Sequence, residues 1–457
     1  MLRFVAIDAD QPFKRPAAAR ARDFREVYAA YAADKAAEQA SRCSQCGVPF
    51  CQVHCPLANN IPDWLKLAAE ERFEEAYELS QATNNMPEIC GRICPQDRLC
   101  ERNCVIAQSG HGTVTIGAIE KFLTDTAWKE GWVKPLTPRR ERPQSIAVVG
   151  AGPAGLACAE QLRIKGYKVT VFDRHDRAGG LLTYGIPNFK LEKDVVRRRV
   201  KRLAAGGIKF KLNCEIGRDV PFTQLRAGYD AVFAAAGAYK ARDTGGPGVP
   251  ALDYLIASNR GSGVLDAKNR DVAVIGGGDT AMDCVRTAVR QGAASVKCLY
   301  RRDRTNMPGS QREVTNAEEE GVEFVWLSAP ESFGGGDKVS TVQASRMRLG
   351  APDASGRRAP EVDPGGGFEV AADLVIKALG FDPEDLPTLF GAPELGVTRW
   401  GTLRADGKTM MTSLDGVFAA GDIVRGASLV VWAIRDGRDV AAHMHAWMRA
   451  RALAAAA

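Results

Sequence analysis

The chain has 457 residues, of which 45% are hydrophobic and 25% charged, and its formal net charge is +6. This usage excludes a disordered, collagen-like or coiled-coil chain, and the length suggests about two to four domains. Apolar runs are too short to span a membrane, and acidic residues occur too early for a secretory signal. The positive charge is spread along the chain, so we expect a cytoplasmic protein with no membrane or nucleic-acid partner.

Eight of the 12 cysteines lie between Cys43 and Cys104. They form two groups, CSQCGVPFCQVHCP at 43–56 and CGRICPQDRLCERNC at 90–104. Disulfides are rare in cytoplasmic proteins, so clustered thiols predict a metal site. Three close cysteines followed by a Cys-Pro pair are typical of ferredoxins, in which the last cysteine binds the second of two clusters. Eight thiolates could hold two [4Fe–4S] clusters.

Structural zinc is the alternative for these cysteines. Zinc sites often use two CxxC pairs, and this chain has only the pair at Cys43 and Cys46. The nucleotide motifs described below favour iron–sulfur clusters, because zinc has no redox chemistry to share with them.

The rest of the N-terminal region is predicted to be helical. Apolar residues recur at helical spacing over 62–80, and 24–40 also has a helical pattern. A linker rich in proline and arginine, 134–143, ends this domain.

A first nucleotide-binding unit follows the linker. The apolar run 145–149 predicts a strand, GAGPAG follows at 150–155, and a helical pattern comes next. The glycines allow a pyrophosphate to approach the helix N-terminus. A second predicted strand, 168–172, ends at an acid that can accept hydrogen bonds from ribose hydroxyls. The expected contacts in this unit are Gly150, Gly152, Ala154, Gly155 and Asp173.

The same pattern returns later with the opposite charge. The predicted strand 271–275 leads into GGGDTA at 276–281, and the predicted strand 295–300 ends at two arginines. Arginine favours a ribose 2′-phosphate where an acid would repel it. We therefore expect NADPH here and a nucleotide with a free ribose in the first unit. The expected NADPH contacts are Gly276, Gly278, Asp279, Thr280, Ala281, Arg301 and Arg302.

Three further segments support a flavin beside a nicotinamide. Similar predicted strands at 231–237 and 374–380 flank the second unit and indicate crossings between domains. Near the C-terminus, a predicted strand ends at Gly421 and Asp422, before a helical segment that begins at 429. An acid placed there can hold the ribityl chain of a flavin.

Taken in this order, the motifs resemble the family of small (beta) subunits of NADPH-dependent glutamate synthase, which shares its plan with the N-terminal half of dihydropyrimidine dehydrogenase. The resemblance covers essentially the whole length, and GGLLTYGIP at 179–187 resembles the family's loop near the isoalloxazine ring. It implies an α/β fold of the glutathione/adrenodoxin reductase type: an iron–sulfur domain at 1–143, an FAD domain at 144–255 and 385–457, and an NADPH domain inserted at 256–384. It also implies FAD contacts at Gly180, Leu181, Gly421 and Asp422.

The resemblance further implies that one cluster takes an oxygen ligand from a helix after the last cysteine, where Glu120 lies. The implied sets are Cys43, Cys46, Cys51 and Glu120 for one cluster, and Cys55, Cys94, Cys100 and Cys104 for the other. Cys90 in place of Glu120 remains open.

The predicted function is that of an electron-input subunit. NADPH would reduce FAD, and two [4Fe–4S] clusters would carry single electrons onward, with no catalytic acid–base residue required. Residue 2 is leucine, so the chain lacks an N-terminal cysteine nucleophile. The resemblance implies a hetero-oligomer with a large (alpha) subunit that carries FMN and its own iron–sulfur cluster and makes glutamate from glutamine and 2-oxoglutarate. Ferredoxin or a pyrimidine-reducing subunit as the electron acceptor, and a zinc-stabilised flavoprotein without electron output, are the alternatives.

Overall fold

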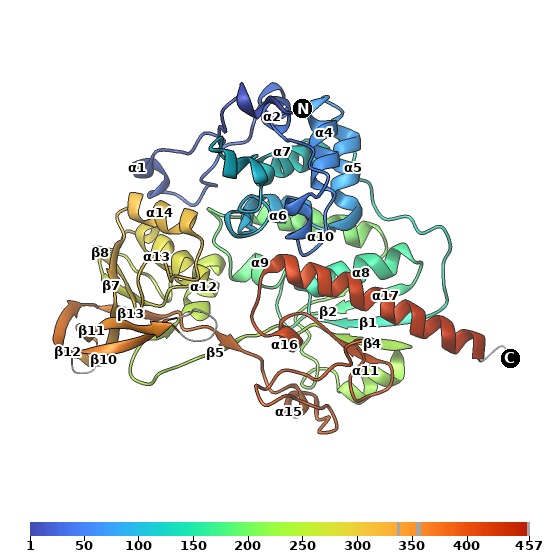
Figure 1. Ribbon diagram of the computed structural model, residues 1–457. Helices are drawn as coiled ribbons and strands as arrows, with labels where there is room; N and C mark the ends of the chain where they lie inside the picture. Colours follow the sequence, from blue (N-terminus) through green and yellow to red (C-terminus); the bar gives the residue numbers. More distant parts are fainter. Residues whose placement is uncertain (336–338, 353–357, 455–457) are drawn as a thin grey trace.

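The computed structural model describes residues 1–335, 339–352 and 358–454 (Figure 1). N-terminal helices lie at the top in Figure 1, one sheet lies at the lower right around β1, β2 and β4, and a second lies at the lower left around β7, β8 and β13. Across the described ranges, no helix has both the length and the apolar character needed to cross a membrane.

The N-terminal part is helical and irregular. Its core is apolar and includes Trp64, Leu65 and Leu123, each at most 1% exposed. Its elements are η1 (Arg3–Val5), α1 (Ala17–Arg20), α2 (Ala33–Ala40), α3 (Phe50–Val53), α4 (Ile61–Ala69), α5 (Phe73–Thr83), α6 (Pro87–Ile93), η2 (Gln96–Arg98), η3 (Val105–Ser109) and α7 (Ile116–Lys129).

Two helix predictions in this region were wrong in extent. The helix predicted over 62–80 is two helices, α4 and α5, separated at Glu71, whose φ of 58° is left-handed and cannot continue a helix. The helix predicted over 24–40 begins only at Ala33. The preceding residues form no helix, because their backbone groups bond elsewhere in the molecule: the Val27 amide donates to the Phe189 carbonyl at 3.2 Å.

The first nucleotide unit forms a five-stranded sheet in the order β15-β4-β1-β2-β3, with every neighbouring pair parallel. Its strands are β1 (Ser145–Val149), β2 (Lys168–Phe172), β3 (Lys209–Lys211), β4 (Ala231–Ala234) and β15 (Val417–Ala419). The last strand comes from the far end of the chain, so residues before and after the second unit share one sheet. Its helices are α8 (Pro153–Ile164), α9 (Leu181–Tyr184), α10 (Lys193–Ala205), α11 (Phe222–Gly228), α15 (Leu386–Phe390), α16 (Asp422–Arg425) and α17 (Val430–Ala454).

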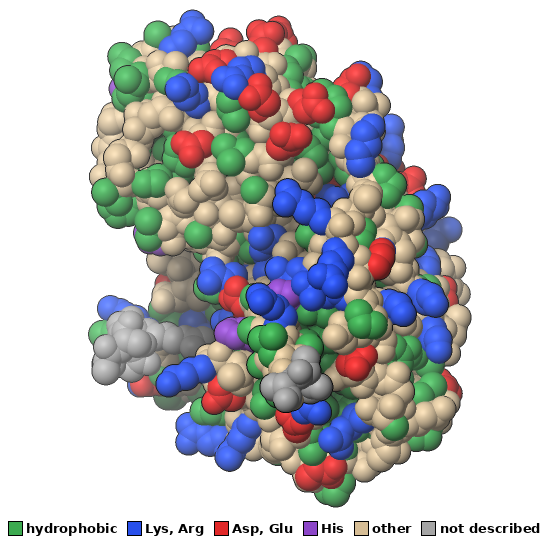
Figure 2. Space-filling view, turned by 90° about the vertical axis from the view of Figure 1, so that its right-hand side faces the viewer, with side chains coloured by type: hydrophobic (Ala, Val, Ile, Leu, Met, Phe, Trp, Pro, Cys, Tyr) green, Lys and Arg blue, Asp and Glu red, His purple; other side chains and the backbone are tan. Residues whose placement is uncertain are grey.

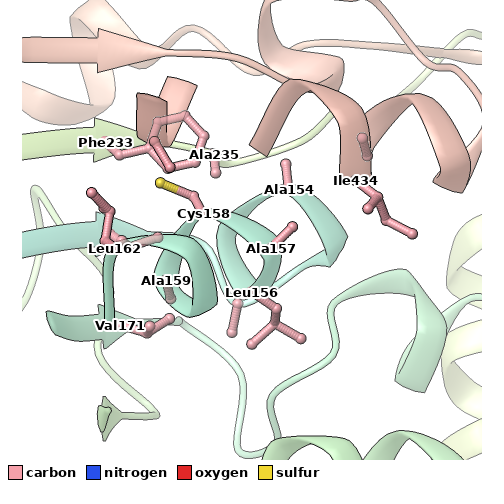
Figure 3. Packing of buried hydrophobic residues seen from close by; sticks show 14 of the residues in the cluster. Ala154, Leu156, Ala157, Cys158, Ala159, Leu162, Val171, Phe233, Ala235 and Ile434 are labelled. Carbon is pink, nitrogen blue, oxygen red and sulfur yellow. The ribbon is translucent and has the colours of Figure 1, made fainter. Parts of the chain in front are cut away.

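Helix α8 forms the centre of the core in this unit. Its small residues Ala157 and Ala159 are fully buried, and Cys158 points toward Phe233 of β4 in Figure 3. Gly437 allows α17 to approach closely, since a Cβ there would lie 2.3 Å from the Ala154 carbonyl oxygen. The start of α8 is therefore fixed between the sheet and the C-terminal helix.

The second unit has a similar five-stranded sheet, in the order β6-β13-β7-β8-β9. Its outer strand β6 precedes the other strands in the chain, whereas β15 follows those of the first sheet. A three-stranded antiparallel sheet, β10-β11-β12, follows β9 in the chain. The elements are β6 (Val249–Pro250), α12 (Ala251–Arg260), β7 (Asp271–Ile275), α13 (Asp279–Gln291), β8 (Ser295–Tyr300), α14 (Gln311–Glu319), β9 (Glu323–Trp326), β10 (Ser328–Gly334), β11 (Thr341–Pro352), β12 (Arg358–Ala371) and β13 (Leu374–Lys377).

The chain crosses between the two sheets at a short ribbon. Strand β5 (Lys240–Ala241) pairs antiparallel with β14 (Phe381–Asp382). Lys377 holds the adjoining loop, because its buried Nζ lies 2.7 Å from Asp243 and donates to the Gly246 carbonyl. The two sheets are therefore joined by a defined pair of strands.

One face of the molecule is hollowed between the upper and lower parts (Figure 2). Lys, Arg and His side chains gather in and around this hollow in Figure 2.

Candidate functional site

Four of the N-terminal cysteines line one small cavity, and we call them the outer set: Cys43, Cys46, Cys51 and Cys104. Burial raises the pKa of the Cys51 thiol to about 12, and the neighbouring thiols add to the shift. Buried thiols that face one another are costly as free thiolates and become favourable when they bind iron. The chemistry of these donors therefore fits an iron–sulfur cluster.

A second group, the inner set, consists of Cys55, Cys94, Cys100 and Glu120. Burial is the main cause of the raised pKa of the three thiols, and the negative charge of Glu120 raises each of them further. Glu120 itself is buried, and its Oε1 accepts from Ser80 at 3.4 Å and Asn84 at 3.3 Å. Burial raises its pKa to about 8 despite these hydrogen bonds. A buried carboxyl group beside three thiols fits an oxygen ligand for a metal cluster.

The neighbours that the structure gives these residues differ from the expected grouping in two members. Cys104 was expected with Cys55 but lies in the outer set, and Glu120 was expected with Cys43 but lies in the inner set. Glu120 reaches the inner set because α7 packs across α6, where Gly91 allows the two backbones to touch. Cys90 lies on α6, fully buried near Glu120. Among the residues that the structure describes, no three His, Cys, Asp or Glu side chains converge as ligands of a single metal ion would.

The first glycine motif forms a cradle between β1 and α8. Gly150 has a φ of 110°, and a Cβ there would lie 2.3 Å from the Ala235 carbonyl oxygen. A Cβ on Gly155 would lie 1.9 Å from the Gly150 oxygen, so both positions require glycine. A Cβ on Gly152, the N-cap of α8, would meet no heavy atom of the described residues within 4 Å. This open space at a helix N-terminus fits a pyrophosphate.

Asp173 lies at the end of β2, as the sequence predicts. Its Oδ2 accepts from the Ala151 amide at 2.7 Å, which ties the acid to the glycine loop. Asp173 also lines a cavity of about 60 Å³ with His175 and Tyr239. The Nε2 atom of His175 is buried and has no hydrogen-bond partner among the described residues. Such an atom fits a polar ligand group, as expected for the adenosine part of a dinucleotide.

The other two segments predicted to bind FAD, at Gly180 and at Gly421, lie against the same glycine motif. Gly180 has a φ of 54°, and a Cβ there would lie 2.8 Å from the Gly152 Cα, so the loop before Leu181 crosses directly over the glycine loop. Gly421 approaches Ala154 from the other side, where an added Cβ would lie 3.0 Å from the Ala154 Cβ. Burial raises the pKa of Asp422 to about 7. The structure thus brings Asp173, Gly180 and Gly421 together around the glycine motif at the start of α8.

The second glycine motif has the same geometry. Gly276 has a φ of 146°, and an added Cβ would lie 2.3 Å from the Ala378 carbonyl oxygen. At Gly278, the N-cap of α13, an added Cβ would meet no described heavy atom within 4 Å. Ala281 is fully buried against the sheet. Thr280 is at the start of α13 and faces the junction cavity described below.

Asp279 and the two arginines differ in their surroundings. Asp279 accepts a hydrogen bond from the Ser310 amide at 2.9 Å, so it orders the loop opposite the motif. Arg301 is exposed at the end of β8. Arg302 is only 7% exposed, and its Nε donates to the Arg358 carbonyl at 3.2 Å. Of the two, Arg301 is the one free to meet a ligand in solvent.

A cavity of about 360 Å³ lies where the three parts of the chain meet, and we call it the junction cavity. We call residues 179–190 the flavin-type loop, and it contributes Ile186, Phe189 and Lys190. The segment after Asp422 contributes 428–431. The second nucleotide unit contributes Asp279, Thr280, Asp283, Arg286, Ser310, Arg312 and Glu313. The N-terminal part contributes Cys94 of the inner set, among others.

Sequence reasoning did not single out several residues of the two cavities, among them His175 beside Asp173 and Lys190 in the junction cavity. His175 lies two positions after Asp173, so its place after a nucleotide-binding strand was the available signal. Lys190 belongs to the continuation of the loop at 179–187, but its ion pairs with the second unit are visible only in the tertiary structure.

Comparisons with known proteins agree with this site. A family model described as dihydropyrimidine dehydrogenase domain II, 4Fe-4S cluster, matches residues 20–132. A family model of pyridine nucleotide-disulphide oxidoreductases matches residues 144–437. The iron–sulfur match decides against the zinc alternative. FprA from Mycobacterium tuberculosis in complex with NADPH has the same fold over 69% of this chain and 86% of its own, with a TM-score of 0.59 and 21% identity.

Full-length relatives are more similar. The small chain of glutamate synthase [NADPH] from Azospirillum brasilense is 64% identical, over 99% of this chain and 97% of its own length. The protein of the same name from Escherichia coli K12 is 46% identical, over 98% of each. The chain is thus an NADPH-dependent oxidoreductase that uses FAD and [4Fe–4S] clusters. It belongs to the family of small chains of NADPH-dependent glutamate synthase.

Proposed function

We propose that this chain is the electron-input subunit of a glutamate synthase. It would oxidise NADPH and deliver the electrons to a large subunit that carries FMN and an iron–sulfur cluster and makes glutamate from glutamine and 2-oxoglutarate. The junction cavity carries the proposal, because it is lined by the flavin-type loop, by the second nucleotide helix and by Cys94. Groups that exchange electrons must come close together, and this cavity is where the three binding units meet.

The proposed cluster ligands follow the two sets defined above. The outer set would hold one [4Fe–4S] cluster and the inner set the other. We take Glu120 as its fourth ligand, because its buried carboxyl group lies beside the three thiols and has hydrogen bonds only from Ser80 and Asn84 among the described side chains; Cys90, which is also buried there, is the alternative. Val48, Phe50 and Val53, beside the outer set, are 45% to 64% exposed, which supports an exit for electrons on this side.

The proposed nucleotide contacts are those predicted from the sequence, with Arg301 rather than Arg302 on the 2′-phosphate. When bound, FAD accepts a hydride from NADPH and releases its two electrons singly to [4Fe–4S] clusters. The amides at the starts of α8 and α13 would face the two pyrophosphates. Asp173 would orient the ribose of FAD, and Asp422 its ribityl chain.

The proposed domain limits are 1–143, 144–255 with 385–457, and 256–384. The pairing of β5 with β14 supports a crossing between the second and third domains. Because β6 (Val249–Pro250) pairs with β13, a limit a few residues before 256 accounts better for the sheet.

Reconstitution with the large subunit tests the proposal. The chain, purified under anaerobic conditions, is mixed with that subunit, glutamine, 2-oxoglutarate and NADPH, and glutamate is measured. We expect glutamate formation that requires both subunits and stops when this chain lacks iron. Rapid electron transfer to ferredoxin or to a pyrimidine-reducing subunit, with no glutamate formed, would contradict the glutamate synthase assignment.

A further inference from the structure

We propose that Lys190 is a positioning residue for hydride transfer, because it fixes the flavin-type loop against the nucleotide-binding helix α13. This inference rests on the proposed role of the junction cavity as the place where NADPH meets FAD. Lys190 is in the loop that continues from Gly180, whereas its partners belong to the other nucleotide unit.

The ion pairs of Lys190 cross directly between the two units. Its Nζ lies 2.9 Å from Asp283 Oδ1 and 3.5 Å from Glu313 Oε2. The three side chains are only 9% to 14% exposed, and all three residues line the junction cavity. Asp283 is four residues after Asp279, one turn into the helix whose N-terminus would hold the NADPH pyrophosphate. A shift of this contact would therefore move the nicotinamide relative to the flavin.

The neighbouring residue of the loop makes a second contact with the same helix. The guanidinium groups of Arg286 and Arg290 lie over the Phe189 ring, at 4.7 Å and 3.8 Å from its centroid. Arg286 also pairs with Glu313 at 2.6 Å, so the carboxylate shared with Lys190 is itself fixed. Lys190 thus extends a rigid network of paired charges into the cavity.

The carboxylates around Lys190 keep its ammonium group ionised. Burial alone would lower the pKa of Lys190, but Asp283 and Glu313 outweigh it and hold the pKa above its ordinary value. Burial raises the pKa of Asp283 to about 6, and Lys190 opposes the rise. A charged pair in a desolvated site is held tightly, which suits a residue that fixes distance and not one that exchanges protons.

Anaerobic stopped-flow reduction of FAD by NADPH tests the role of Lys190 in Lys190→Met, Lys190→Arg and the wild type. Small misplacements of reacting groups cost up to about 100-fold in rate. We expect the limiting rate in Lys190→Met to fall by about 10- to 100-fold, with unchanged FAD content and NADPH half-saturation within about threefold. Lys190→Arg should recover most of the rate. The isotope effect with NADPH deuterated at C4 should rise in Lys190→Met, because hydride transfer becomes more limiting.

Two controls separate positioning from folding. Lys14→Met removes the pair of Lys14 with Glu319 at 2.7 Å, which also joins the N-terminal part to the second unit, but Lys14 is not among the described residues that line the cavity. Its rate should stay within about twofold. In Lys190→Met, the buried carboxylate of Asp283 loses its positive partner. The double variant Lys190→Met with Asp283→Asn removes that unpaired charge, so it should be more thermally stable than Lys190→Met but reduce FAD no faster.

Wild-type rates in Lys190→Met, or in the double variant, would overturn the proposal. So would a fall in the amplitude of FAD reduction with the rate and isotope effect unchanged, because that indicates loss of folded protein. The measurement needs no large subunit, so a chain that served another electron acceptor would fail the glutamate test and still give a clear result here.

Discussion

Arg301 and Arg302 are adjacent in the sequence and differ in environment, so their substitutions should differ in effect. Arg301→Ala should raise the KM for NADPH by about 10- to 100-fold with little change for NADH, because an exposed guanidinium at the end of β8 suits a 2′-phosphate. Steady-state kinetics with both nucleotides measure this. Arg302→Ala should instead lower stability by about 1–3 kcal/mol, because it leaves the Arg358 carbonyl without its donor. An unchanged NADPH preference in Arg301→Ala would contradict the assignment.

Glu120 and Cys90 lie side by side, and their substitution separates the two candidates for the fourth ligand of the inner set. Glu120→Ala should lose or alter one cluster and with it up to about half of the iron, since one cluster of the pair loses an anchor. With Glu120 as the ligand, we expect Cys90→Ala to retain the iron, because a buried cysteine outside the ligand set packs as a small apolar side chain. Iron analysis and electron paramagnetic resonance of the reduced protein provide the measurement. The reverse result would assign the ligand to Cys90.

At the scale of elements, the N-terminal cysteines lie in or beside helices that are too short to be stable alone. Elements α3, η2 and η3 have only three to five residues each, whereas α4 and α7 have 9 and 14 and pack an apolar core. Short helices are unstable without tertiary support. The thiolate–iron bonds are thus expected to hold these short pieces.

Removal of iron should therefore loosen the cysteine segments selectively. Amide hydrogen exchange should rise across 43–60 and 94–115 in iron-depleted protein, with much smaller changes in α4 and α7. Mass spectrometry of protein before and after chelation measures this, and reconstitution with iron and sulfide should restore protection. Unchanged exchange in 43–60 would show that the clusters do not order this segment.

At the scale of the whole molecule, the N-terminal part and the FAD unit share a core and a buried ion pair. Leu57, Met86 and Ile89 pack in the same apolar cluster as β1 and α8. Arg199 of α10 donates to both oxygens of Glu88 on α6, at 2.6 and 2.7 Å, and both side chains are at most 3% exposed. The two parts should therefore unfold together.

Glu88→Ala tests this coupling. It leaves Arg199 buried without its partner and should lower the free energy of unfolding by about 3–5 kcal/mol. Glu141→Ala is the matched control, because Glu141 is 61% exposed in its pair with Arg163 and its loss should cost under about 1 kcal/mol. Denaturant unfolding followed by FAD fluorescence and by cluster absorbance measures both. Separate transitions for the two signals in the wild type would contradict the shared core.

The sequence alone determined the nucleotide-binding units. The predicted strands 145–149, 168–172, 271–275 and 295–300 all appear with those bounds, since each is a short apolar run next to its glycine motif. The positions of Asp173 and Arg301 followed from the same local rule, because strand, turn and helix are consecutive in the chain. The helical, cysteine-rich character of the N-terminal part followed from composition and spacing.

The tertiary structure decided how distant segments combine. Spacing could not show that Cys104 lies beside Cys43. Nor could it show that Glu120 lies near Cys55, because this depends on how α7 packs across α6. Residues 24–32 have a helical pattern but form no helix, because Phe13, Arg15 and Phe189 offer them backbone hydrogen bonds that no local pattern reveals. The place of Lys190 between two units likewise depends on their packing, since charges far apart in sequence pair only once the domains meet.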